Sequence, residues 1–140
     1  MFAMERGPEN FRDIKWGTDI EGLSDMIIVN ENKFEKMCER KDEILTIGKA
    51  SVQFIRYFFY EDKFYSVYIS FLDKENFNYL REYLFNLYGQ PDRSRKLYTY
   101  YWFGKEVDIS FRYNHMLGFG SLTYDYLPIS DQLKKELTEE

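Results

Sequence analysis

The sequence predicts an α+β domain, a two-layer sandwich in which one long helix packs on one face of an antiparallel β-sheet. Segment 51–72 holds two aromatic-rich runs split by the polar turn Glu61-Asp62-Lys63, and the second run alternates with period two. Segment 74–88 instead repeats its apolar residues at helical spacing. Short polar turns separate the other strand candidates, which favours antiparallel pairing because parallel strands need longer crossovers.

Size and composition fit a single domain. The chain has 140 residues, enough for one core without a disulfide or metal. Aromatic residues make up 20% of it, which favours β structure; a ligand-stacking surface is the alternative use of these rings. The pattern predicts a flexible N-terminal arm at 1–10, the domain at 11–129, and a short C-terminal helix or tail at 130–140.

The first half begins with a short helical turn and short strands. Thr18 and Glu21 match a capping box, which predicts a turn at about 19–23. Strand candidates follow at 26–29, 34–39 and 44–47, separated by polar segments that suit hairpin turns.

The second run of the aromatic hairpin assigns its side chains to two faces. One face carries Tyr65, Val67, Ile69 and Phe71, which we expect in the core, and the other carries Phe64, Ser66, Tyr68 and Ser70.

The long helix is predicted from about residue 74 to residue 88. Asp73 is its expected N-cap, and Gly89 and Pro91 end it. Its apolar stripe consists of Phe77, Leu80, Leu84, Leu87 and Tyr88. This stripe must be buried, and the apolar face of the sheet is the surface available to cover it.

Three more strands are predicted at 96–103, 106–113 and 119–126. The middle one is amphipathic, with Val107, Ile109, Phe111 and Tyr113 on one face and Glu106, Asp108, Ser110 and Arg112 on the other. Gly118 and Gly120 suit a hairpin among large rings. Each half of the chain thus opens on a helix and continues into antiparallel strands.

Charge and cysteine usage limit the classes of partner and compartment. The net charge is −5 and neither half is basic, so we expect no nucleic-acid partner. The basic cluster Arg93, Arg95 and Lys96 is predicted in a loop, as solvated charge or as a contact for an anion or acidic partner. Cys38 is the only cysteine, which fits a reducing compartment. No signal peptide is recognised, so cytoplasmic location is the default and an exported mature form the alternative. No apolar stretch reaches the 18 residues of a membrane span, and we expect no membrane insertion.

Motifs for catalysis are weak. One His and one Cys do not make a zinc site, and we expect neither metal nor cofactor. His115, in the loop 114–118, is the only imidazole base, and Ser110 and Asp108 share a strand face near it. A hydrolase-like site at this loop is therefore the enzymatic alternative. We expect Cys38 to be an inert thiol because its neighbours do not favour a thiolate.

One constellation suggests recognition. We expect the sheet face away from the helix to carry Phe64, Tyr68, Asp108 and Arg112 with small serines between them. Rings beside charges form a plausible binding platform. Cross-strand pairing on a solvated face is the alternative reading.

Two resemblances bear on the fold. The run Phe11-Arg12-Asp13-Ile14-Lys15-Trp16-Gly17-Thr18, the hairpin around 57–67 and the helix end Leu87-Tyr88-Gly89-Gln90-Pro91 resemble a family of uncharacterised bacterial proteins with an F-x-x-I-x-W-G-T opening. That resemblance covers most of 11–126 and implies a shared fold without an activity; some relatives are exported. The helix end followed by an antiparallel sheet is also similar to β-lactamase-inhibitor-protein-like domains, at the level of fold alone.

From the sequence we expect a small non-catalytic binding domain. A protein is the expected partner, held on an open sheet face. The alternatives are the hydrolase-like enzyme with a pocket at the His115 loop and a structural homodimer formed by self-association.

Overall fold

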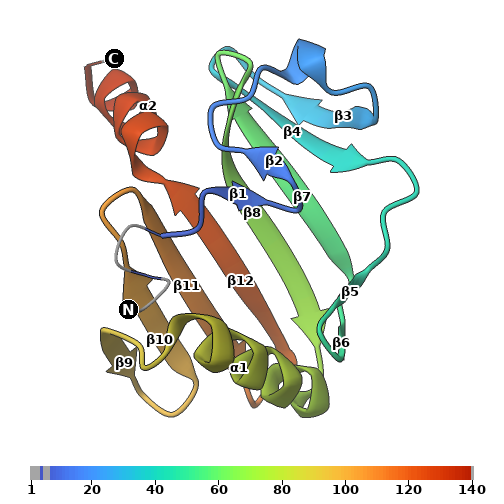
Figure 1. Cartoon of the computed structure of the whole chain (residues 1–140), viewed down its shortest axis with the longest axis vertical. Helices are drawn as coiled ribbons and strands as arrows, with labels where there is room; N and C mark the ends of the chain where they lie inside the picture. The colour runs from blue at the N-terminus through green and yellow to red at the C-terminus, as the bar shows by residue number, and fades with distance from the viewer. Residues whose placement is uncertain (1–3, 5–6, 140) are drawn as a thin grey trace.

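The computed structural model describes residue 4 and residues 7–139. Within that part of the chain, eight strands form one antiparallel sheet (Figure 1). In spatial order they are β3 (Met26–Glu31), β4 (Glu35–Arg40), β7 (Phe54–Tyr60), β8 (Lys63–Leu72), β12 (Phe119–Tyr126), β11 (Val107–Asn114), β10 (Thr99–Phe103) and β9 (Arg93–Arg95). The predicted α+β class with an antiparallel sheet is confirmed.

Two helices and three short elements complete the fold. Helix α1 (Lys74–Tyr88) joins β8 to β9, and α2 (Leu127–Glu139) follows β12. The hairpins β1 (Asn10–Phe11) with β2 (Ile14–Lys15) and β5 (Thr46–Ile47) with β6 (Ala50–Ser51) stand outside the main sheet. A 3₁₀ turn, η1 (Ile20–Gly22), precedes β3.

The sheet is built from two consecutive sets of four strands. β3, β4, β7 and β8 run from one edge to the middle, and β9, β10, β11 and β12 run from the other edge to the middle. The two sets meet where β8 pairs with β12 in antiparallel register. The halving of the sequence thus appears in the strand order.

One face of the sheet forms the aromatic core. Helix α1 buries Phe77 against it, with the Phe77 ring centroid 5.0 Å from those of both Phe111 and Tyr113. The N-terminal segment covers another part of the same face, where Trp16 stacks on Phe64 at 4.7 Å. Figure 1 shows α1, β1 and β2 lying on this side of the sheet. Burying such rings contributes roughly 1.5–3 kcal/mol for each side chain, which makes this face the main source of stability.

Polar groups fix the N-terminal segment to the core. The Glu43 carboxylate, 7% exposed, accepts hydrogen bonds from Tyr57 Oη and from Arg12 Nη1, the latter at 3.1 Å. Arg12 also donates to the carbonyl oxygens of Ile44 and Thr46. Burial and the bond to Glu43 raise the pKa of Tyr57 well above its usual value. These groups satisfy one another and tie the start of the chain to the β4–β5 loop.

A β-bulge changes the faces expected for the start of β8. Phe58 pairs with Ser66, but the next residue, Phe59, pairs with Phe64, so Tyr65 is the extra residue of the bulge. Phe64 therefore turns to the core face, where it is fully buried. The expectation that Phe64 lies on the open face is wrong, because a one-residue insertion reverses the alternation beyond it.

The hydroxyl of Tyr65 donates to Glu35 on β4, and burial together with this bond raises the pKa of Tyr65. Tyr65 is buried as expected, at 7% exposure. It is the extra residue of the bulge, however, and does not continue the alternation that includes Val67.

The helix predictions need three corrections. The bounds 74–88 of α1 are confirmed, but Leu87 is 44% exposed and does not belong to the buried stripe. Asp73 makes no side-chain capping bond; its carbonyl accepts from Phe77 N at 3.1 Å. In the first turn, Asp19 and not Thr18 is the cap, because its side chain accepts from Glu21 N.

Several strand and end predictions also change. The segment 44–47 is a strand only at Thr46–Ile47. The loop expected at 93–95 is the edge strand β9. Helix α2 starts at Leu127, ahead of Pro128, because proline is tolerated in a first helical turn. The bounds 119–126 are confirmed for β12.

Close packing explains one glycine of the last hairpin. A Cβ at Gly120 would lie 2.4 Å from Phe71 Cζ and 2.3 Å from the carbonyl oxygen of Arg112. Glycine is therefore required for the Phe71 ring to occupy the core beside β12.

The expected N-terminal arm, residues 1–10, falls partly outside the described residues. Residues 1–3 and 5–6 lie outside the described residues. Where it is described, the segment contacts the domain: Met4 is buried, and Trp16 Nε1 donates to the Pro8 carbonyl at 2.9 Å.

The bulge makes a testable distinction between two neighbouring rings. Phe64→Ala removes a fully buried ring and should lower the free energy of unfolding by about 3–5 kcal/mol. Tyr68→Ala truncates a ring that is 37% exposed on the opposite face and should lower it by about 1 kcal/mol or less. Urea unfolding followed by circular dichroism measures both. Equal losses would contradict the bulged register.

Candidate binding surface

We name the sheet face opposite α1 the open face. It carries two rows of side chains, each of which crosses six strands. Cross-strand register places these residues side by side. The first row is Arg56, Tyr68, Thr123, Ser110, Tyr101 and Arg93, and the second is Phe54, Ser70, Ser121, Arg112, Thr99 and Arg95. Most of these side chains are half-buried or exposed. The face therefore presents rings, hydroxyls and arginines to its surroundings.

Three of the four residues predicted for binding lie on this side of the sheet. Tyr68 is 37% exposed, Arg112 is exposed and Asp108 is half-buried. Phe64 is absent from this face because the bulge directs it into the core. Tyr68 and Ser110 are two strands apart, and Arg112 is two residues beyond Ser110, so the Tyr68 and Arg112 Cα atoms are about 12 Å apart.

Tyr68 belongs to a small cluster at the β7 end of the open face. Its ring stacks on Phe54 with centroids 6.1 Å apart, and Arg56 lies 4.0 Å from the Phe54 ring centroid. Arg56 Nε also donates to Glu39 at 3.3 Å. The charge of Arg56 is thus already neutralised within the fold, and the cluster offers mainly ring surface.

Asp108 lies at the end of this face that α2 approaches. Burial raises the pKa of Asp108, the amide of Gly104 opposes that rise, and Asp125 on the facing strand adds to it. Asp125 accepts a hydrogen bond from Ser66 Oγ at 2.8 Å. Asp108 is four residues from Arg112 on β11, about 13 Å, so the two do not form an ion pair. The predicted charge pair is therefore separated into an acidic end and a basic end.

The basic end carries three arginines, Arg93, Arg95 and Arg112, for which no ion pair is found among the described residues. Arg112 and Arg95 flank Thr99 in one row, and Arg93 is two residues from Arg95 on the same face of β9. Among the described residues, no carboxylate lies within ion-pair distance of these three side chains. An arginine that no internal carboxylate neutralises keeps its donors free for an external acceptor.

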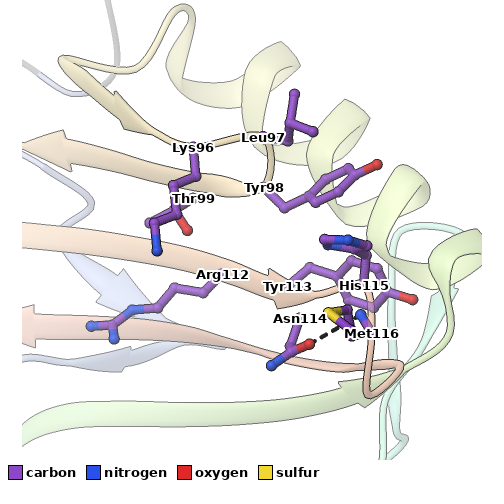
Figure 2. A pocket seen from close by; sticks show the side chains of 9 residues that line it. All are labelled: Lys96, Leu97, Tyr98, Thr99, Arg112, Tyr113, Asn114, His115 and Met116. Atoms are coloured by element: carbon purple, nitrogen blue, oxygen red, sulfur yellow. Dashed lines mark hydrogen bonds between the residues drawn. The ribbon is translucent and has the colours of Figure 1, made fainter.

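A groove opens beside Arg112 at the end of β10 and β11. It has a volume of about 620 Å³ and is lined by residues 96–99 and 112–116; we name it the cationic groove. Lys96 and Arg112 contribute fixed positive charge, and no Asp or Glu lines it. Figure 2 shows Lys96, Thr99 and Arg112 on one side and the rings of Tyr98, Tyr113 and His115 on the other.

The walls of the cationic groove are held by local interactions. Asn114 Oδ1 accepts from the amides of Met116 and Leu117, both at 3.0 Å, which fixes the turn after β11. Gly118 completes that turn at φ +73°. Tyr98 packs edge-on against Phe77 under α1, with centroids 5.3 Å apart. The groove is therefore shaped before any ligand arrives.

His115 lies at the groove rim without the partners that catalysis needs. Its ring centroid is 5.3 Å from that of Tyr98. The lining includes neither Ser110 nor Asp108, so the cleft expected to join them to His115 does not form there. Burial raises the pKa of the Cys38 thiol to about 11, which opposes a nucleophilic role for the sulfur. Among the described residues, no group of three or more His, Cys, Asp or Glu is arranged to hold a metal.

Comparisons with family models, with curated proteins and with solved structures find no match to this chain. The resemblances noted in the sequence therefore stay predictions. No described helix is both long enough and apolar enough to cross a bilayer.

Sequence reasoning missed the contribution of β9. Arg93 and Arg95 are two positions apart, which is the spacing of two side chains on one strand face, and Ser94 between them faces the other way. The charged residues around them favoured a loop interpretation. The period-two spacing is the signal that could have placed both arginines on the sheet.

The raised pKa of Asp108, caused first by burial and then by Asp125, predicts that removing its charge increases stability in a pH-dependent way. Because the folded pKa of Asp108 is raised, its ionised form opposes folding above that pKa, and the effect vanishes once both states are protonated. Asp108→Asn should therefore raise the urea midpoint at pH 7 and leave it unchanged near pH 3, where wild type is protonated as well. Asn keeps an oxygen for the Gly104 amide. An equal gain at both pH values would contradict this account.

Proposed function

We propose that this chain is a small non-catalytic binding domain whose partner is a protein held on the open face. The proposal depends on the two-layer arrangement, in which α1 and the N-terminal segment cover one face of the sheet. One observation carries it: the uncovered face combines half-exposed rings with arginines that no described carboxylate neutralises.

The residue types on this face match those that bind proteins. Tyrosine and arginine are enriched among residues that contribute most to interface affinity. Tyr68 and Tyr101 lie three strand spacings apart on either side of Thr123 and Ser110, so small side chains leave room beside each ring. A partner surface could thus contact both rings and reach Arg112.

A structural homodimer is the second candidate, and the edge strand β3 favours it. Ile27, Ile28 and Val29 are each 43–50% exposed at an edge whose outer backbone groups pair with no described strand. Uncovered apolar edges pair readily with another strand. The bulge at Val29 shortens the regular part of this edge, which makes it the weaker candidate.

The open face is tested by substitutions that preserve the fold. Tyr68→Ala and Arg112→Ala should each abolish capture of the partner from the native host's lysate, because each removes a contact side chain from the open face. Quantitative mass spectrometry of proteins retained on the immobilised chain measures the loss.

The control for this capture is Lys49→Ala, which removes an exposed charge from the β5–β6 turn, away from the open face. All three variants should keep the wild-type circular dichroism spectrum. Unchanged capture by Tyr68→Ala and Arg112→Ala would contradict the proposal. Light scattering at micromolar concentration tests the homodimer by measuring the molar mass. A dimer that is lost in the Ile28→Lys variant would assign the self-association to β3.

A further inference from the structure

We propose that the cationic groove takes an acidic, extended segment of the partner protein, with carboxylates on Arg112 and Lys96 and an apolar side chain among the groove's rings. This inference rests on the proposed function, since it names the chemistry of the partner at one end of the open face.

Charge is the first argument. Residues 93–116 contain five Arg and Lys side chains against two Asp and Glu, in a chain whose net charge is −5. The cations at the groove and on β9 form no ion pair with a carboxylate in the described part of the chain. By contrast, Arg12, Arg40 and Arg56 each form an ion pair with a carboxylate, as Arg40 does with Asp25 at 2.9 Å. The arginines at the groove and on β9 therefore differ from these three in having no ion-pair partner among the described residues.

Spacing supports an extended ligand. Arg112 and Arg95 flank Thr99 two strand spacings apart, about 10 Å between their Cα atoms, and Lys96 follows Arg95 directly. In an extended segment, side chains at positions i and i+2 point the same way and are about 6.7 Å apart. Two carboxylates so placed can reach Arg112 and Lys96 together. A helical ligand would instead present neighbouring carboxylates at i and i+4.

Exposed apolar side chains at the rim of the cationic groove favour a ligand that includes an apolar residue. Leu97 is 74% exposed on one side of the groove, and Met116 is 83% exposed on the other. The half-buried ring of Tyr98 lies between them, whereas Tyr113 is only 8% exposed and packs on Phe77 beneath it. Methionine and aromatic rings suit variable apolar contacts. A purely charged segment would leave this surface in water, so the ligand should combine acidic and apolar side chains.

The rest of the open face opposes a nucleic acid. Asp108 and Asp125 lie side by side at the other end of this side of the sheet, where α2 adds Asp131 near Asp108. A polyanion long enough to follow the sheet would meet these carboxylates. A short protein segment can occupy the basic end alone.

Selection from a library of random dodecapeptides displayed on phage tests the ligand chemistry, with the immobilised full chain as bait. We expect enriched peptides to carry Asp or Glu two positions apart next to Leu, Met or an aromatic residue. The best peptide, labelled with fluorescein, is then titrated by fluorescence anisotropy. Its affinity should fall at least about tenfold for the variant combining K96A with R112A, because each lost pair is a charge-assisted contact. Raising NaCl from about 50 to 300 mM should weaken wild-type binding several-fold.

The matched control is Lys105→Ala. Lys105 is exposed in the turn between β10 and β11, at the opposite end of the same hairpin, so its loss changes net charge without touching the groove. It should leave peptide affinity within about twofold of wild type, since surface charges at that distance are screened.

Several outcomes would overturn the inference: no enriched peptides, enriched peptides without acidic residues, or equal losses in the K96A/R112A and K105A variants. Tighter binding of a fluorescein-labelled dodecauridylate RNA than of the selected peptide would assign the groove to nucleic acid. If partner capture depends on Tyr68 while peptide selection shows no acidic preference, the groove inference fails alone. If acidic peptides bind at the groove but partner capture ignores Tyr68 and Arg112, the proposed function fails instead.

Discussion

Burial of one aromatic face of the sheet is the constraint on which the rest of the structure depends. Phe64, Phe77 and Phe111 are fully excluded from solvent in a continuous layer that joins both halves of the sheet. This layer fixes where α1 and the N-terminal segment must lie, since they are the elements that cover it. It also explains the bulge at Tyr65, which turns the Phe64 ring toward the core under Trp16. The open face is what α1 and the N-terminal segment leave uncovered, and α2 packs against β7, β8 and β12 at the end near Asp108.

The open face differs chemically from the core face because its side chains contact water, whereas those of the core face pack against one another. Its charges separate along β11, with Asp108 and Asp125 at the α2 end and Arg112 at the groove end. At the acidic end Ser66 donates a hydrogen bond to Asp125, and α2 brings both Lys134 and Asp131 near Asp108, whereas the arginines of the basic end form no ion pair with a described carboxylate. Binding at the basic end therefore offers the larger electrostatic gain. The same polarity favours the short acidic segment that we propose as the ligand.

The sequence predicts this fold well wherever the pattern is strictly periodic. The bounds of α1 follow from its helical spacing together with Gly89 and Pro91, and the bounds of β12 and the alternation of β11 were also predicted. The bulge could not be predicted, because Phe64 and Tyr65 are adjacent aromatic residues and the pattern does not show which of the two faces the core. Phe64 was misplaced for that reason. Tyr68 and Arg112 were placed on the correct face of the sheet. The groove was not predicted, because its walls come from two turns that meet only in the folded chain.

Hydroxyl-radical footprinting of the free chain, read by mass spectrometry, tests most directly that one face is core and the other open. Rings of the same type provide the comparison: Phe103 is 48% exposed and Phe64 fully buried, and Tyr68 is 37% exposed while Tyr57 is fully buried. The account predicts rapid oxidation of Phe103 and Tyr68 and protection of Phe64 and Tyr57. Oxidation of Phe64 at the rate of Phe103, or protection of Tyr68 to the level of Tyr57, would contradict it.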